Sequence, residues 1–185
     1  MRFTSALPQF DLFGVNALPS YVISTHSKIS CFGLFSGMGH GSKNEFEGQF
    51  GINLYDMPDT NKANRTVKGA IVHLYSCDCG QGLGPHLVTL GARAFIGYTQ
   101  PVNVPKSQSM VEEFVRISVA IDESILNSDS ATTTKTKADA EFNSVEARLL
   151  ASPATSPREL ALFRLNHRGM VGPWTDPTYR KYGWF

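Results

Sequence analysis

The sequence predicts an α/β domain in which a mainly parallel sheet is covered by helices on both faces. Three predominantly apolar runs of strand length occupy residues 29–36, 69–76 and 93–99. Such runs are typical of strands that are buried on both faces of a sheet. Segments with helical patterns follow the second and third runs, and this alternation is typical of parallel sheets between helices.

Composition bounds the class of protein. The chain has 185 residues, the size of one domain, and 42% hydrophobic and 18% charged residues are typical of a globular chain. A net charge of +1 does not imply a basic face, so nucleic acid is not expected as a partner. No apolar run approaches the roughly 20 residues of a membrane span. Pro8, Gln9 and Asp11 interrupt the first residues, unlike a signal peptide. We therefore expect neither a nucleic-acid nor a membrane partner.

The cysteine count favours a reducing compartment. There are three cysteines, Cys31, Cys77 and Cys79, and an odd, low number argues against a disulfide framework. A cytoplasmic location is therefore expected. Packing, metal binding or catalysis remain as roles for these thiols.

Other elements are predicted from local pattern. Residues 21–24 suggest a short strand, residues 48–55 a hairpin strand and residues 57–66 an exposed loop. Helices are expected over 85–92, 107–126 and 138–151, the middle one from apolar residues at helical spacing. Between the last two, residues 127–137 contain no apolar side chain larger than alanine, which predicts a mobile surface loop that proteases cut easily.

The last predicted helix has a clear start signal. Ser156 is placed as the N-cap, Pro157 as the first helical residue and Glu159 as the third, which is the pattern of a capping box. The helix is expected to end near Gly169.

Two residues that could act together follow two of the buried strands. His40 lies in the glycine-rich segment after the first strand, and Cys77 begins the segment after the second. The carboxyl ends of parallel strands meet at one edge of the sheet, so these residues are expected to converge. An imidazole can take the proton of a thiol and so produce a nucleophilic thiolate. Gly41 can offer its amide to an oxyanion.

The residues alone leave other interpretations open. A lone cysteine is usually a small packing residue, and a lone histidine is usually hydrogen-bonded in a core or at the surface. Cys77 and Cys79 could instead hold zinc with His40, His73 or His86, although no second cysteine or histidine pair has the usual spacing.

Three further residues near these motifs have simpler interpretations. Cys31 lies in the middle of a predicted strand and is expected to be buried. His73 is interpreted as a histidine of the core or of the second sheet face. Ser76 lacks the G-x-S-x-G surroundings of a serine nucleophile.

Four motifs, in order, resemble those of the caspase-like cysteine peptidases, a group that includes caspases, gingipains, separases and CHAT domains. LFSGMGHGS resembles the strand that ends in His-Gly, and VHLYSCDCG resembles the strand that ends in the catalytic cysteine. LGPHLVTLGARAFIGYTQPV is similar to the helix and strand that follow in CHAT domains and gingipains. LNHRGMVGPWTDPTYR loosely resembles the closing segment.

This resemblance implies a caspase-like three-layer sandwich and a cysteine endopeptidase that acts on protein or peptide substrates and needs no cofactor. By position, His40 and Cys77 match the catalytic pair, and the Gly41 and Cys77 amides match the oxyanion donors. Cys79 would be a bystander that points away from His40. The predicted substrate contacts are Tyr75, Tyr98, Thr99 and Gln100.

The chain also departs from the family pattern. Residues 1–28 leave little room for the usual strands before the histidine, so this part is expected to be reduced, before a catalytic core over 29–126 and closing helices over 138–185. A protein partner or a further chain segment could complete the sheet. The caspase signature Gln-Ala-Cys is absent, because Tyr75 and Ser76 precede Cys77. The alternative function is a non-catalytic caspase-like interaction module, or a fragment of a larger peptidase.

Overall fold

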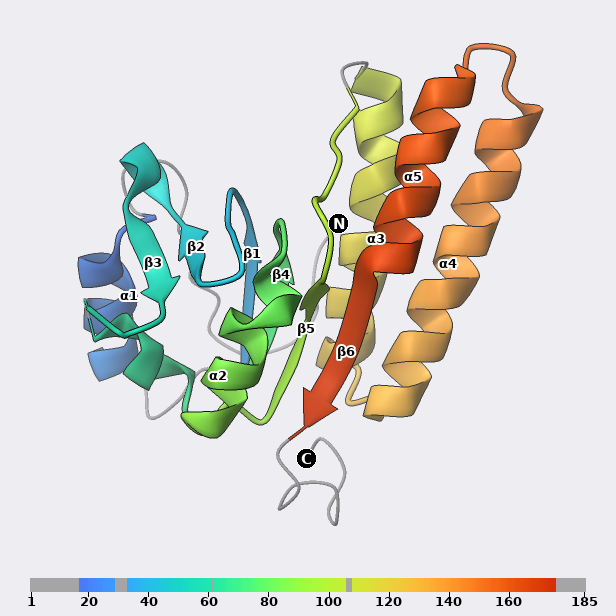
Figure 1. Cartoon of the computed structure of the whole chain (residues 1–185). Coiled ribbons are helices and arrows are strands. Elements are labelled where there is room, and N and C mark those ends of the chain that lie inside the picture. The colour runs from blue at the N-terminus through green and yellow to red at the C-terminus, as the bar shows by residue number, and fades with distance from the viewer. Residues whose placement is uncertain (1–16, 29–32, 61, 106–107, 176–185) are drawn as a thin grey trace.

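The central element of the fold is a mainly parallel sheet (Figure 1). The computed structural model describes residues 17–28, 33–60, 62–105 and 108–175. Within these ranges, four strands form one sheet in the order β1-β4-β5-β6. β1 (Leu34–Met38), β4 (Ile71–Tyr75) and β5 (Ala94–Tyr98) are parallel, and β6 (Met170–Thr175) is antiparallel to β5. The predicted mixed α/β class is thus confirmed.

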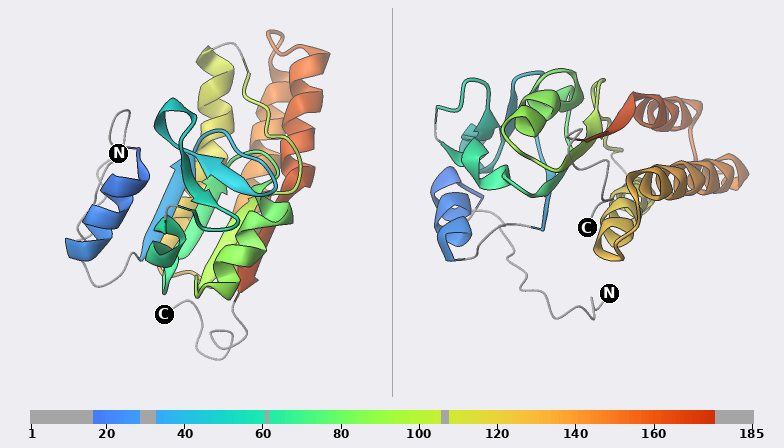
Figure 2. Two further views of the ribbon diagram at one scale, coloured as in Figure 1. Left: turned by 60° about the vertical axis from the view of Figure 1, so that its left-hand side comes forward. Right: turned by 90° about the horizontal axis from the view of Figure 1, so that it is seen from below.

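One face of the sheet packs against the long helices. Ile71, Tyr75 and Ile96 point to this side and belong to a core that includes Phe114, Phe142 and Phe163 of the helices. The covering elements are α3 (Gln108–Leu126), α4 (Ala131–Ala151) and α5 (Pro157–Gly169). These helices lie together on one side of the sheet, as Figure 2 shows from below.

The opposite face has its own core and a more varied cover. Val72, Leu74 and Phe95 alternate with the residues of the first face and therefore point the other way. The cover consists of α1 (Pro19–Lys28), α2 (Leu83–Thr89), the 3-10 turn η3 (Ala63–Val67) and a hairpin of β2 (Glu45–Glu47) and β3 (Asn53–Asp56). The sheet is thus the middle one of three layers.

The predicted helix boundaries with clear capping signals are confirmed. Ser156 accepts a hydrogen bond from the Glu159 amide, and the Glu159 side chain accepts one from the Ser156 amide, which completes the capping box of α5. α2 ends just before Gly91, whose φ of 102° suits glycine after a helix. None of the described helices is long and apolar enough to cross a bilayer.

The strand predicted over residues 21–24 is wrong, because these residues lie in α1. Val22 and Thr25, three positions apart, are the buried residues of this helix. Their burial against η3 and β3 outweighs the strand preference of the β-branched side chains. Among the described residues no strand precedes β1, which is an edge strand of the sheet.

The hairpin strand predicted over residues 48–55 is only partly right. Asn53–Asp56 forms β3, but Gln49–Gly51 forms the 3-10 turn η2. Phe50 takes a φ of 60° in that turn, which breaks the extended conformation.

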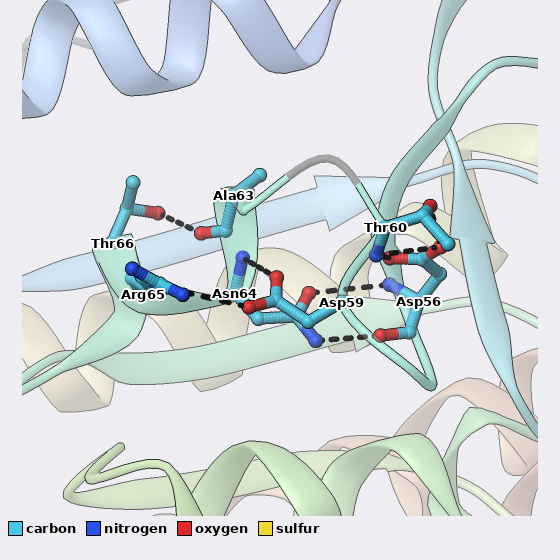
Figure 3. A network of polar contacts seen from close by, with 7 residues as sticks. All are labelled: Asp56, Asp59, Thr60, Ala63, Asn64, Arg65 and Thr66. Carbon is cyan, nitrogen blue, oxygen red and sulfur yellow. Dashed lines mark hydrogen bonds and ion pairs between the residues drawn. The ribbon is translucent and has the colours of Figure 1, made fainter.

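The exposed loop predicted over residues 57–66 is wrong in its second half. Ala63, Asn64 and Thr66 are buried in η3. The Asn64 side chain accepts a hydrogen bond from the Asp56 amide and donates one to the Asp56 carbonyl, as Figure 3 shows. Asp59 accepts from the Asn64 amide and pairs with Arg65. Polar residues of this segment therefore satisfy each other and need not face water.

The mobile loop predicted over residues 127–137 is wrong from residue 131 onward, because α4 begins at Ala131, and only residues 127–130 lie outside the two helices. Ser130 caps the helix by accepting a hydrogen bond from the Thr133 amide. Thr134 is fully buried, and its hydroxyl lies 3.1 Å from the hydroxyl of Ser124 on α3. A polar side chain that finds a buried partner can face a core, which the composition of the segment could not reveal.

β6 was not anticipated by the sequence analysis. It pairs with β5 through an irregular register near Phe95 and Gly97. Gly172 has a φ of 105° there, and a Cβ at this position would lie 2.5 Å from the Phe95 carbonyl oxygen. Only glycine fits this close approach.

A buried polar group ties α3 to the sheet. His73, expected to be a core or second-face histidine, is buried on β4, and its Nδ1 lies 2.7 Å from Asp122 of α3. Ser36, which pairs with His73 in the β1–β4 register, donates its hydroxyl to the other Asp122 oxygen at 2.7 Å. The core expectation for His73 is confirmed.

Two adjacent leucines near the end of α4 can be used to test how this helix packs in the core between the sheet and the long helices. Leu149 is 3% exposed and Leu150 is 59% exposed. Leu149→Ala should lower the free energy of unfolding by about 2–5 kcal/mol, because it opens a cavity in the core. Leu150→Ala should change it by less than about 0.5 kcal/mol. Urea unfolding followed by circular dichroism measures both, and equal losses would contradict the described orientation of α4.

Candidate active site at the ends of β1 and β4

Two loops meet at the carboxyl ends of adjacent parallel strands. Met38 and Tyr75 are paired residues at the ends of β1 and β4. The Gly39 amide donates to the Tyr75 carbonyl at 3.3 Å, which continues the pairing by one step. His40 and Cys77 each lie two residues beyond that pair. The predicted convergence of these two segments is therefore found in the backbone.

The loop that carries His40 is one arm of a small antiparallel pairing. The His40 carbonyl accepts from the Glu47 amide, and the Ser42 amide donates to the Glu45 carbonyl, each at 2.9 Å. Gly41 lies between these two hydrogen bonds, opposite Phe46. Gly41 and Phe46 thus form a non-hydrogen-bonded pair, in which the backbone hydrogen bonds are made by the residues on either side. The Gly41 amide therefore takes no part in this pairing.

Gly41 allows the loop to press against the segment that carries the cysteines. A Cβ at Gly41 would lie 2.3 Å from the Ser76 Oγ and 2.8 Å from the Cys79 Sγ. It would also lie 2.7 Å from the Glu45 carbonyl oxygen. No side chain fits in this contact, so glycine is required for the two loops to touch.

The Cys77 sulfur faces the segment that follows β5. Cys77 is half-buried, and the Val102 amide donates a hydrogen bond to its Sγ at 3.2 Å. Two further bonds join the same loops: the Asp78 amide donates to the Gln100 carbonyl, and Gln81 Nε2 donates to the Thr99 carbonyl at 2.8 Å. The Cys77 thiol therefore lies where the segment after β4 and the segment after β5 are joined by several hydrogen bonds.

Cys79 lies on the other side of the same turn, at the start of the 3-10 turn η4 (Cys79–Gln81). It was expected to point away from His40, but its sulfur packs against Gly41, the residue next to His40. Its Sγ donates to the Glu45 carbonyl at 3.3 Å. Burial raises the pKa of this thiol to about 11, and the Ser76 hydroxyl opposes part of that rise. Cys79 is thus a protonated packing residue at neutral pH.

The His40 ring is exposed, and no described hydrogen bond joins it to either thiol. The structure therefore brings the two predicted loops together without closing the contact between the imidazole and the Cys77 thiol. Cys31, which was expected to be buried, lies outside the described residues.

The predicted substrate contacts divide into buried and accessible residues. Tyr75 and Tyr98 are buried, with ring centroids 5.2 Å apart and planes at 72°. Thr99 and Gln100 are nearer the surface, and the Thr99 amide donates to the Gly169 carbonyl at 2.8 Å. A role in substrate binding stays a prediction for all four.

Three residues that contact this site were missed by the sequence analysis. Val102 touches the Cys77 sulfur, Asn103 follows it, and Asn166 of α5 bonds Asn103. Asn166 lies 63 positions after Asn103 in the chain, so no local sequence pattern could indicate that they are in contact.

Among the described residues, no three His, Cys, Asp or Glu side chains are grouped to hold a metal ion.

Comparisons of the chain with protein-family models, with curated proteins and with solved structures found no match.

The close approach at Gly41 can be tested with a matched glycine. Gly41→Ala should lower the free energy of unfolding by about 1–3 kcal/mol, because the new methyl group displaces Ser76, Cys79 or the Glu45 carbonyl. Gly33→Ala is the control, since a Cβ there meets no atom of the described part of the chain within 4 Å, and its effect should stay below about 0.5 kcal/mol. Chemical unfolding of both variants measures the difference, and equal effects would contradict the contact.

The two described thiols should differ in reactivity. At pH 7 a thiol with a pKa of about 11 is ionised in roughly one molecule in ten thousand, and Cys79 is also buried. Iodoacetamide should therefore modify Cys77 at least about tenfold faster than Cys79 in the folded protein. Raising the pH toward 11 should speed the labelling of Cys79.

Mass spectrometry of timed digests measures both rates, and Cys79→Ser should leave the labelling of Cys77 unchanged. Faster labelling of Cys79 than of Cys77 would overturn the assignment of the buried and accessible thiols.

Proposed function

We propose that this chain is a cysteine endopeptidase with a caspase-like fold, in which Cys77 is the nucleophile and His40 its general base. The observation that carries the proposal is the pairing of Met38 with Tyr75 at the ends of adjacent strands. His40 and Cys77 each follow two residues after that pair. A histidine and a cysteine at the carboxyl ends of neighbouring parallel strands are in the position where α/β sheets build their sites.

The environments of the two thiols favour Cys77 over Cys79. Cys79 is buried, donates to the Glu45 carbonyl and has a raised pKa, so it offers little thiolate and no access. Cys77 is partly accessible and receives a hydrogen bond from the Val102 amide. A donated hydrogen bond stabilises the anionic form of its acceptor, which is the form that attacks.

Backbone amides beside the thiol supply an oxyanion site in this proposal. Among the described backbone hydrogen bonds, neither the Gly41 amide nor the Cys77 amide donates to a carbonyl. Both amides therefore remain available to the negative oxygen of a tetrahedral intermediate. Gly41 has no side chain that would obstruct a substrate chain beside His40.

The reaction proceeds in two steps. His40 takes the thiol proton, the Cys77 sulfur attacks the peptide carbonyl, and the amine leaves with the proton that His40 returns, so a thioester remains. Water then attacks the thioester while His40 accepts its proton. The acid product leaves, and the Cys77 sulfur regains a proton from His40. These steps use two side chains, two amides and water.

The exposed His40 ring is compatible with this mechanism. Catalytic hydrogen bonds are often long in a free enzyme and tighten when the substrate binds. His40 is anchored through its backbone, because its carbonyl accepts from the Glu47 amide. Its side chain can therefore turn without a change of the loop.

Since both described thiols are free, we propose a reducing, cytoplasmic setting for the activity.

A non-catalytic interaction module is the second candidate. It is favoured by the open geometry of the His40 side chain and by the position of β1 at the sheet edge, where no described strand precedes it. In that case a protein partner or a further chain segment would complete the sheet, and the Cys77 thiol would not be activated. The two candidate functions predict different results for one property: the reactivity of the Cys77 thiol depends on His40 in the peptidase and does not depend on it in the interaction module.

Removing either member of the pair should abolish cleavage. We expect Cys77→Ala and His40→Ala to lower peptide hydrolysis at least about a thousandfold, since a nucleophile and its base act as a unit. The substrate is unknown, so the protein is incubated with a denatured cell extract and new N-termini are identified by mass spectrometry. Cys79→Ser is the control and should retain cleavage.

Labelling separates the candidates even without a substrate. His40→Ala should slow iodoacetamide labelling of Cys77 about tenfold at neutral pH, because the base that favours the thiolate is lost. Replacement of His26 on α1, which belongs to neither loop, should leave the rate unchanged. Absent cleavage together with unchanged labelling in His40→Ala would favour the interaction module.

A further inference from the structure

The segment after β5 determines what surrounds the Cys77 sulfur. The Val102 amide donates to this sulfur at 3.2 Å, and the Cys77 thiol donates to the Val102 carbonyl at 3.8 Å. Residues 101–105 belong to no helix or strand. Without a regular hydrogen-bonding pattern of its own, this segment must be held in place by its surroundings.

A buried asparagine of α5 holds the segment at Asn103. Asn166 is 2% exposed, and its Oδ1 accepts from the Asn103 amide at 2.9 Å. Its Nδ2 donates to the Asn103 carbonyl at 2.8 Å. One planar side chain thus bonds both backbone groups of a single residue, which fixes the position and the orientation of the peptide units next to Val102.

Tyr75 connects this clamp to the strand that carries Cys77. Asn166 Nδ2 also donates to the Tyr75 hydroxyl at 3.1 Å, and that hydroxyl donates to the Asn103 carbonyl at 3.5 Å. Burial raises the pKa of Tyr75, so the hydroxyl keeps its proton at neutral pH. Because Tyr75 ends β4 two residues before Cys77, Asn166 joins α5, β4 and the 102–103 segment.

We infer that Asn166 is a positioning residue of the proposed peptidase: it fixes Asn103 so that the neighbouring Val102 amide donates to the Cys77 sulfur and stabilises its thiolate. The inference rests on the proposed function. Asn166 does not touch the sulfur, and acts only through the backbone that it holds. Its loss should therefore change the reactivity of the Cys77 thiol without removing any group that touches the sulfur.

The chain contains a matched control for a purely structural effect. Asn64 in η3 is also fully buried, and its side chain also bonds the amide and the carbonyl of one residue, Asp56 (Figure 3). Asn64→Ala and Asn166→Ala each remove the same kind of clamp. Both substitutions should lower the melting temperature, but only Asn166→Ala should alter the reactivity of the Cys77 thiol.

The experiment measures the rate of Cys77 alkylation by iodoacetamide against pH in the full chain, for the unchanged protein and for each variant. Asn166→Ala should move the midpoint of the profile upward, because the thiolate loses a hydrogen-bond donor. The rate near neutral pH should fall about three- to tenfold. Asn64→Ala should keep the original midpoint.

Tyr75→Phe provides a milder variant in case Asn166→Ala does not fold. It removes the hydroxyl from the clamp and leaves both bonds between Asn166 and Asn103, so an upward shift smaller than that of Asn166→Ala is expected. Folding of each variant is checked by circular dichroism.

The outcomes separate this inference from the proposed function. If Cys77 labelling depends on His40 but neither Asn166→Ala nor Tyr75→Phe moves the midpoint, the positioning role is overturned and the peptidase proposal stands. If Asn64→Ala shifts the midpoint as much as Asn166→Ala, the effect is general loss of stability and the inference is again overturned. If Cys77 labelling is insensitive to His40, the proposed function fails first.

Discussion

Parallel pairing between β1 and β4 is the constraint on which the candidate site depends. The register that places Met38 opposite Tyr75 also directs the two following segments to the same edge of the sheet. This register is maintained by burial on both faces, since Val72 and Leu74 face one core while Ile71 and Tyr75 face the other. A shift by one residue would exchange these faces and would be costly.

Close packing then assigns different roles to two cysteines that are only two residues apart. Because Gly41 has no side chain, the His40 loop contacts Cys79, which becomes buried and protonated. The Cys77 sulfur faces the opposite loop and receives the Val102 amide. The turn between them is made by Asp78 with a φ of 54°, a conformation that aspartate tolerates better than most residues. One tight turn thus separates a packing thiol from an accessible one.

Buried polar side chains provide the specificity of the arrangement where apolar packing cannot. Asn166 and Asn64 each satisfy both backbone groups of one residue in an irregular segment. His73 and Ser36 share Asp122 and so join α3 to β1 and β4. Hydrogen bonds of this kind have strict geometry, and an unpaired buried group is costly, so they select one position for each segment.

The sequence by itself determined the buried strands β4 and β5, the C-terminal end of α2 and the capping box of α5, because apolar periodicity and capping act over a few neighbouring residues. The strand predicted over 29–36 as buried on both faces is instead the edge strand β1, in which only Phe35 of residues 34–38 is buried. Topology also placed His40 and Cys77 at one edge. Only the tertiary structure decided that Cys79 packs beside Gly41, that Thr134 is buried within α4, that residues 21–24 are helical and that Asn166 reaches Asn103. Each of these depends on contacts between segments far apart in the chain, whose packing outweighs local preference.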